Sequence, residues 1–231
     1  SERIAHRQRP LLPCEYEQLV LQEFPGLAKV KCLRGIDAKS LNRATVVTLV
    51  AIRNRISKDW PLCTDQLLCR IESFLRPYTS PFAKIDAINP VYEEVTVFCG
   101  VSLKEGQQAG EAISDINRNL CRCIAPWNEE QKEPVLGYCF SIRDLISCIK
   151  ENPSVEALHG IKLLQVIGEE AKFGLKEYTG EQDENQTIAP SVPWGILVPA
   201  VRQYVKLVEA GEWRQDIEFG DLEVENTFVI Q

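Results

Sequence analysis

Methionine is absent from this chain of 231 residues, and histidine occurs only twice, as His6 and His159. Catalysis by a nucleophile and a base usually needs a histidine or a comparably tuned group. His6 lies in a basic leader and His159 directly precedes a glycine, and neither has an evident catalytic neighbour. The G-x-S-x-G, P-loop and G-x-G-x-x-G motifs are absent as well. These absences predict a protein that is not an enzyme and that needs no cofactor.

Long apolar runs are also missing. No stretch approaches the ~18 residues that a membrane-spanning helix needs, and no signal-peptide pattern opens the chain. The formal net charge of -7 argues against a polyanionic partner. The leader "RIAHRQRP" is basic, but it is short and lacks interleaved aromatics that would stack on bases. We therefore predict neither direct membrane insertion nor nucleic-acid binding.

The nine cysteines are odd in number and scattered, unlike the dense pairs of a secreted disulfide framework. We interpret them as free thiols in a reducing compartment, several of them acting as small core hydrophobes. Cys121 and Cys123 are the closest pair, but they lie in an expected helix, where residues two apart point in different directions. No second cysteine knuckle follows, so we predict no metal site. A metal- or thiol-dependent enzyme using Cys121, Cys123 or the histidines remains the less favoured alternative.

Apolar periodicity divides the first part of the chain into alternating elements. "EYEQLVLQEF" has helical spacing, and "LAKVKCL" and "TVVTLVAI" are typical of strands, the second apolar on both faces as in a central strand. "TDQLLCRIESFL" predicts a helix with Thr64 as its N-cap. "FAKIDAI" predicts a further strand that ends at Asn89 and Pro90.

The next part has a related order. "INPVYEEVTVFCGVSL" alternates over its whole length, which predicts a long strand with one buried face. A helix is expected from about residue 107 to 124, and Ser141 with Asp144 forms a capping box for a shorter one. "SVEALHGIKLLQVI" supplies one strand or a bent pair. After an acidic loop, the last residues alternate again and suggest strands with free edges.

We therefore predict an α+β fold made of two tandem ferredoxin-like or split α-β units and a β-rich C-terminal appendage. The expected boundaries are 1-27 for a leader and first helix linked to a missing upstream domain, 28-89 and 90-167 for the two units, and 168-231 for the acidic loop and appendage. The absence of methionine, against about five expected from average composition, together with the start at Ser1, indicates a fragment or a processed chain.

Tryptophan stands beside proline at three places: Trp60, Trp127 and Trp194. Such residues fix a loop against a core or anchor an interface, and the sequence does not separate these roles. The basic leader in turn suits a link to a preceding domain or docking on an acidic neighbour. The candidate interface residues are Arg3, Arg7, Arg9, Tyr16, Trp127 and Trp194.

Several stretches resemble the C-terminal region of baseplate J-like proteins, which are wedge components of contractile phage tails and related injection systems. They are "SERIAHRQRPLLPCEYEQLVLQEFPGLAKVKCL", "LRPYTSPFAKIDAINPVYEEVTVFCGVSL", "SIRDLISCIKENPSVEAL", "PWGILV" and the terminal "FVIQ". The leader and the central link are the most specific of these. Residues 35–43 and 168–190 match no family pattern, so partner contacts made there are not implied.

This resemblance implies a structural role rather than catalysis. Family members assemble with a second baseplate J-like subunit, as a homo- or hetero-dimer, and with other wedge proteins around the spike hub, and they connect to the sheath initiator. Assembly would take place in the cytoplasm, although the finished particle is membrane-anchored in some systems and released in others. The alternative is a free-standing ferredoxin-like module that binds a peptide or nucleic acid. Co-assembly with a related chain would favour the wedge interpretation.

Overall fold

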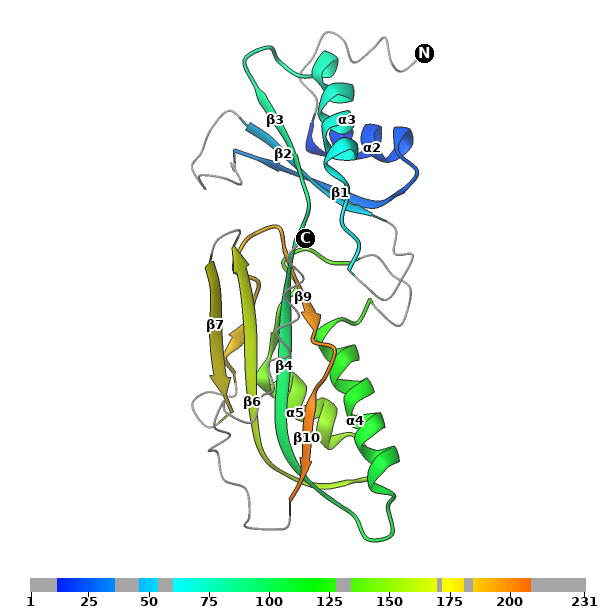
Figure 1. The fold of residues 1–231 in the computed structure, drawn as a ribbon, viewed down its shortest axis with the longest axis vertical. Coiled ribbons are helices and arrows are strands. Elements are labelled where there is room, and N and C mark those ends of the chain that lie inside the picture. The colour runs from blue at the N-terminus through cyan, green and yellow to red at the C-terminus, as the bar shows by residue number, and fades with distance from the viewer. Residues whose placement is uncertain are drawn as a thin grey trace, which may run out of the picture.

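A computed structural model describes residues 12–35, 46–53, 60–127, 134–169, 172–180 and 185–208. The described elements form two units that lie end to end along the long axis of the molecule (Figure 1). The chain passes between them where β3 (Lys84–Ile88) leads through Asn89 and Pro90 into β4 (Val91–Leu103). The expected leader residues Arg3, Arg7 and Arg9, and the last expected strand, fall outside the described residues.

The first unit contains α2 (Pro13–Glu23), β1 (Leu27–Arg34), β2 (Val46–Arg53), α3 (Asp65–Leu75), a short 3-10 turn (Arg76–Tyr78) and β3. Its sheet has the order β1-β2-β3, with β2 antiparallel to β1 and parallel to β3. The central position predicted for "TVVTLVAI" is thus confirmed, because β2 has a partner on each side.

Both helices of the first unit cover the same face of its sheet. Tyr16 and Val20 of α2 and Ile71 and Leu75 of α3 are buried in one cluster with alternate residues of all three strands. Thr64 caps α3, as expected, and its Oγ1 accepts a hydrogen bond from the Leu67 N–H at 3.4 Å. The first helix therefore packs on the sheet of its own unit.

The second unit is built around the long strand β4. It also contains α4 (Ala109–Ile124), β5 (Phe140–Ser141), α5 (Ile142–Lys150), β6 (Val155–Glu169), β7 (Lys172–Thr179), β8 (Thr187–Ile188), β9 (Gly195–Pro199) and β10 (Tyr204–Leu207). β6 is antiparallel to β4 and to β7. β9 and β10 are parallel to β4 and pair with successive parts of it, from Val91 to Val95 and from Phe98 to Val101.

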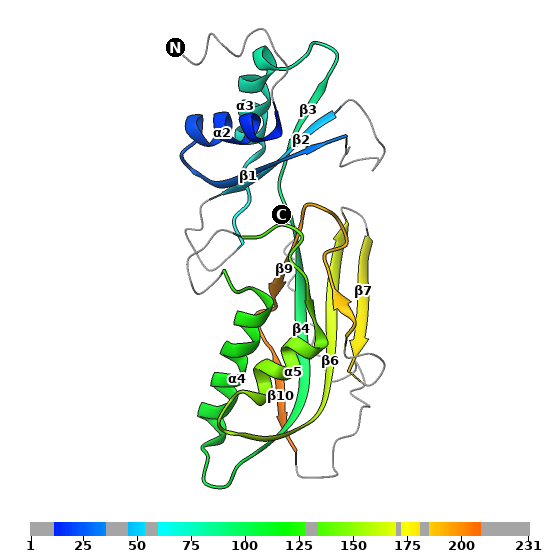
Figure 2. The same cartoon turned by 180° about the vertical axis from the view of Figure 1, so that it is seen from behind.

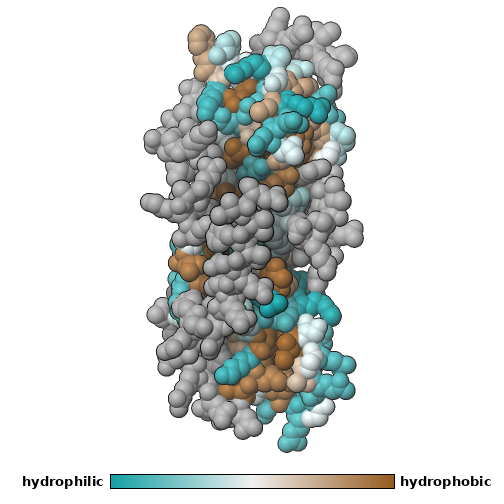
Figure 3. Space-filling model, in the orientation of Figure 1, coloured by the Kyte–Doolittle hydropathy of each residue, from teal (hydrophilic) through white to brown (hydrophobic). Residues whose placement is uncertain are grey.

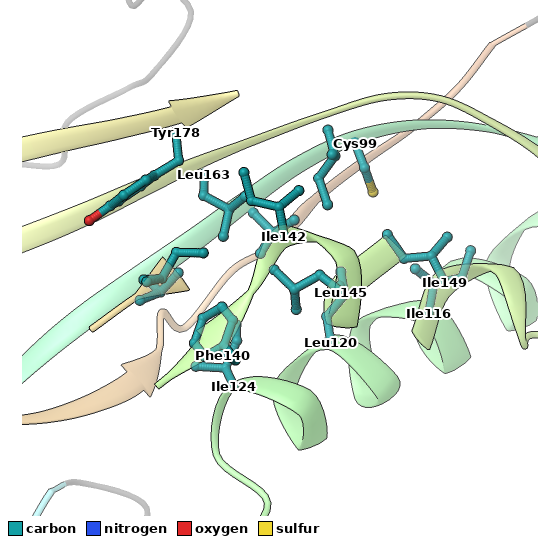
Figure 4. Close-up of a cluster of buried hydrophobic side chains, with 14 of the residues drawn as sticks. Cys99, Ile116, Leu120, Ile124, Phe140, Ile142, Leu145, Ile149, Leu163 and Tyr178 are labelled. Carbon is teal, nitrogen blue, oxygen red and sulfur yellow. The ribbon is translucent and has the colours of Figure 1, made fainter. Parts of the chain in front are cut away.

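Helices α4 and α5 lie side by side on one face of this sheet (Figure 2). The alternation predicted for β4 places Val95, Val97, Cys99 and Val101 against them, and all four are buried. Figure 4 shows how side chains from α4, α5 and β6 fill this core, among them Leu120, Leu145, Ile149 and Leu163. The capping box at Ser141 and Asp144 is present at the start of α5.

The α+β class is confirmed, but the connectivity needs refinement. Among the described residues the first unit has three strands, and its parallel strands β2 and β3 are direct neighbours, unlike those of a four-stranded ferredoxin-like repeat. The C-terminal region expected as an appendage contributes β7, β9 and β10 to the sheet of the second unit. The physical reason is that β4 has two edges and β6 satisfies the backbone groups of only one. The domain boundaries themselves stay a prediction.

Candidate functional site at the junction of the two units

The peptide segment that joins the units is held by a reciprocal hydrogen-bonded pair. Asn89 Oδ1 accepts from the Cys63 N–H at 2.7 Å, and Asn89 Nδ2 donates to the Cys63 carbonyl at 3.0 Å. The Asn89 amide thus acts like a backbone partner for the segment that leads into α3. Tyr92 adds a further bond, from its hydroxyl to the Pro61 carbonyl at 3.2 Å. The linker between the sheets is consequently tied on both sides of Pro90.

A separate apolar cluster spans the two units, which we call the junction core. Ile52 of β2 is buried there with four residues of the second unit, and aromatic side chains close its edges. Trp60 stacks on Tyr92 at a ring-centroid distance of 5.8 Å. Its buried members are Ile52, Ala125, Trp127, Ile196 and Val198, and Trp60, Tyr92, Leu136 and Tyr138 pack around them. Shared burial of this kind opposes independent motion of the units.

Below the junction, a buried carboxylate fastens the loop that precedes β9. Glu93 is buried and accepts hydrogen bonds from Gln165 Nε2, from the Ser191 N–H at 2.8 Å and from the Ser191 hydroxyl. Gln165 is positioned in turn by Tyr178, whose hydroxyl donates to Gln165 Oε1 at 2.7 Å. Glu93 is therefore satisfied by three donors, as a buried charge must be. Burial, with Glu93 nearby, raises the pKa of Tyr178, which keeps this hydroxyl a donor.

Gly195 allows this loop to fold back at the start of β9. A Cβ at this position would lie 2.5 Å from Pro190 Cβ and 3.0 Å from the Val192 carbonyl oxygen. Because the first contact is closer than real Cβ atoms show, any larger residue would displace the loop from Glu93. Close backbone approach, rather than an unusual φ angle, is the reason for glycine here.

The three aromatic residues predicted to lie in an interface are buried within the fold of this chain. Tyr16 packs in the core of the first unit and hydrogen-bonds through its hydroxyl to Thr79 Oγ1 at 3.1 Å. Trp127 belongs to the junction core, and its Nε1 is buried without a partner in the described part of the chain. Trp194 is buried beside Gly195. Tyr16 packs a helix and the two tryptophans pack loop residues against buried cores, and a role of these side chains in an interface stays a prediction.

The most exposed large apolar side chains lie just outside the strands in which the sequence pattern placed them. Phe82, in the turn before β3, is 91% exposed, and Val201, between β9 and β10, is 96% exposed. The sequence pattern placed both residues in expected strands, but β3 begins only at Lys84 and β10 only at Tyr204. Tyr204 and Leu207 of β10 are also exposed, and Figure 3 shows apolar side chains gathered over the second unit.

The residues considered for catalysis form no evident active site in the described chain. His159 lies in β6 with its Nε2 buried and without a hydrogen-bond partner there. No group of three or more His, Cys, Asp or Glu side chains among the described residues is arranged to hold a metal ion. Burial raises the pKa of the Cys99 thiol to about 12. None of the described helices combines the length and the apolar character that crossing a membrane requires.

No family model matches the chain, and no curated protein matches it. Its fold is similar to that of a chain in the cryo-EM structure of the anti-feeding prophage (AFP) baseplate, 6-fold symmetrised. The alignment has a TM-score of 0.55 and 19% sequence identity. It covers 86% of this chain and 39% of that chain, so the chain spans well under half the length of its neighbour. This likeness extends over most of the α+β architecture described above.

Proposed function

We propose that this chain is a non-enzymatic structural part of the baseplate of a contractile injection system. The observation that carries the proposal is the fold likeness to a baseplate chain over 86% of the residues. The same class of protein is implied independently by the leader and central-link motifs of the sequence.

The junction gives this role a physical basis. In this role the subunit would pass a mechanical load from one neighbour to another. A flexible linker between its two units would bend under that load instead of transmitting it. Here the linker is tied by Asn89 and Tyr92, and the junction core buries residues of both units together. These contacts oppose bending between the two units, which lie end to end along the long axis of the molecule (Figure 1).

The finer proposal follows the resemblance to baseplate J-like proteins. The chain would be a wedge component that pairs with a second baseplate J-like subunit, contacts other wedge proteins and the spike hub, and connects to the sheath initiator. Exposed apolar tips at Phe82 and Val201 support contacts with neighbours, because both side chains project from turns into solvent. Assembly in the cytoplasm belongs to the same proposal.

Affinity purification of the tagged full-length protein from its native host tests the proposal. We expect sheathed particles in negative-stain electron micrographs, with an antibody-gold label on the tag at the baseplate end. An unrelated cytoplasmic protein with the same tag is the control. A small monodisperse protein, purified from cells that do make sheathed particles, would contradict the proposal and favour the binding-module alternative.

A further inference from the structure

The outer strands of the two described sheets differ in how their free edges are treated. These strands are β1 and β3 in the first sheet and β7, β9 and β10 in the second. An edge with unpaired backbone N–H and C=O groups can add a strand from another chain, so folded proteins usually shorten or block such edges. The treatment of each edge therefore indicates where a partner strand can join.

Carboxylates from the helices protect the edge strands of the first sheet. Glu17 of α2 accepts through Oε1 from the Cys32 N–H of β1 at 2.9 Å. Glu72 of α3 accepts through Oε1 from the Ala87 N–H of β3 at 3.0 Å. A strand N–H that is held by a side chain is not open to an added strand. The helices that cover this sheet thus also protect its edges.

The edges at β9 and β10 are protected mainly by their length. β9 has five residues, and the Gly195 carbonyl at its start accepts from the Gly137 N–H at 3.0 Å. β10 has four residues. A short edge strand offers an added strand few backbone groups, and this is a common way of avoiding unwanted pairing.

β7 has neither kind of protection in the part of the chain that the structure describes. It has eight residues and is the outermost strand of its sheet (Figure 1, Figure 2). The Gly180 N–H bonds to the Ile161 carbonyl at 3.1 Å, so the alternation of an antiparallel ladder turns the even-numbered residues of β7 toward β6. Leu175, Glu177 and Thr179 then direct their backbone groups outward. No described residue hydrogen-bonds to these outward groups.

We propose that the outward edge of β7 pairs with β7 of a second copy of this chain. The two strands would run antiparallel across a two-fold axis and join the two sheets into one. The proposal rests on the sheet edges and does not depend on the baseplate assignment. It goes beyond that assignment because it names the strand to which a partner is added.

The exposed side chains of β7 favour one register for this pair. Leu175, Lys176 and Glu177 are exposed, and each of them could lie on the axis opposite its own copy. An axis at Lys176 or at Glu177 would place like charges directly opposite each other, which destabilises a sheet. An axis at Leu175 places two leucines together and sets Lys176 opposite Gly174, which has no side chain to obstruct it.

The acidic group at this edge already has a partner. Glu177 Oε1 lies 2.6 Å from Lys162 Nζ of β6. An incoming strand therefore meets an ion pair instead of a lone carboxylate. Leu175 is 61% exposed, and its burial against the second copy would add an apolar contact at the axis. Backbone hydrogen bonds would supply most of the pairing, so a change of this side chain alone should leave the pairing in place.

Sedimentation velocity of the reduced full chain at a series of concentrations tests the pairing. We expect a monomer–dimer equilibrium in the parent chain. L175P removes an outward N–H that β6 does not use, so the fold should remain while the dimer is weakened by about tenfold or more. L175S is the matched control, because it keeps this N–H, and it should weaken the dimer much less. Circular dichroism and the Tm of L175P check that the chain is folded.

A cysteine cross-link tests the register without blocking the strand. Isotope-labelled and unlabelled L175C chains are mixed, oxidised mildly with copper phenanthroline and digested for mass spectrometry. We expect a disulfide that joins labelled and unlabelled forms of the peptide containing position 175. K176C is the matched control. Its two introduced thiols would lie diagonally across the strands, too far apart for an efficient cross-link.

A parent chain that stays monomeric up to its highest soluble concentration would overturn the proposal. Equal dimerisation of folded L175P and L175S would also overturn it, because the dimer would then use another surface. Cross-linking that favours K176C over L175C would overturn the register centred on Leu175. A monomeric chain found at the baseplate end of sheathed particles would separate the failure of this proposal from the failure of the proposed function.

Discussion

Asn89, which follows β3 directly before the second sheet begins, and Cys63, which precedes α3, exchange two hydrogen bonds, one to and one from the Cys63 backbone. The donor and the acceptor of one side-chain amide are thereby both used, as in a backbone pair. The residue directly before Pro90 thus does more than end a strand. It holds the entry to α3 and the exit from β3 at a fixed separation.

Replacement of Asn89 by alanine should cost about 1–3 kcal/mol of unfolding free energy, because two hydrogen bonds to the backbone of the buried Cys63 are lost. Urea denaturation followed by fluorescence measures the loss. The matched control is N117A in α4, where the side-chain Oδ1 is buried without a partner in the described chain. That variant should lose little stability. Equal losses in the two variants would contradict a special role for Asn89.

Replacement of Glu93 by glutamine should destabilise the chain by about 1–3 kcal/mol. A glutamine amide would direct a donor toward donors that now converge on the carboxylate. Gln165 cannot flip its amide to compensate without losing the hydrogen bond from its Nε2 to the Ala189 carbonyl. The loop at residues 189–194 should become more sensitive to limited proteolysis. E94Q, at the exposed neighbouring position, is the control and should behave like the parent chain. A protease-resistant loop in E93Q would refute the proposed fastening.

The capping box of α5 predicts a defined acid dependence. The Ser141 N–H and hydroxyl donate to Asp144 and lower the pKa of its carboxyl from the ordinary 3.8. A depressed folded-state pKa adds stability above pH 3.8, and this contribution is lost as the pH falls through the folded-state value. The gap in unfolding free energy between the parent chain and D144N should therefore be full at neutral pH and shrink below 3.8.

Loss of the same cap through S141A should cost about 0.5–2 kcal/mol at neutral pH. Urea titrations at a series of pH values give both quantities. A gap between the parent chain and D144N that stays constant, or widens, toward acid would show that the Asp144 charge does not stabilise the helix.

Truncation of Leu120 to alanine should cost about 2–5 kcal/mol, because Leu120 is fully buried between α4, α5 and the sheet and the cavity cannot close completely. L175A gives the same chemical change at an exposed position of β7 and should cost much less. Thermal unfolding of both variants measures the difference. Similar melting temperatures would mean that the α4–α5 layer does not support the second unit.

The exposed tips predict a separation of assembly from stability. F82S and V201S remove apolar side chains that are almost fully exposed, so melting should change little. If these tips contact baseplate neighbours, incorporation of the tagged protein into particles should fall. Unchanged incorporation would remove Phe82 and Val201 from the proposed contacts. L175S serves as the matched exposed control.

Local patterns predicted most elements of the fold because each depends on residues near in sequence. The alternation of β4, the N-cap at Thr64 and the box at Ser141 are examples. The partners of β4 were not predictable, since alternation marks a strand without naming its neighbour. Phe98 is buried on the face that alternation assigned to solvent, where it stacks on Tyr204 of β10 at 4.8 Å.

The contacts at the junction were not predictable either, because they join residues that are far apart in the sequence. Asn89 was interpreted as a strand terminator, and its pairing with Cys63 connects residues 26 apart. Trp127 offered two roles, and only the packing of β9 and Ile52 around it distinguishes a core position. Glu93 stood in an alternating strand beside Glu94, with no local sign that Gln165 and Ser191 would enclose it.

Cryo-EM of sheathed particles purified through the tagged full-length protein would locate this chain inside or outside the baseplate. We expect baseplate density into which the sheets of β1–β3 and β4–β10 fit together as one body, in the relative orientation shown in Figure 1. Density for this fold only outside the baseplate, or no such density in particles that retain the tag, would contradict it.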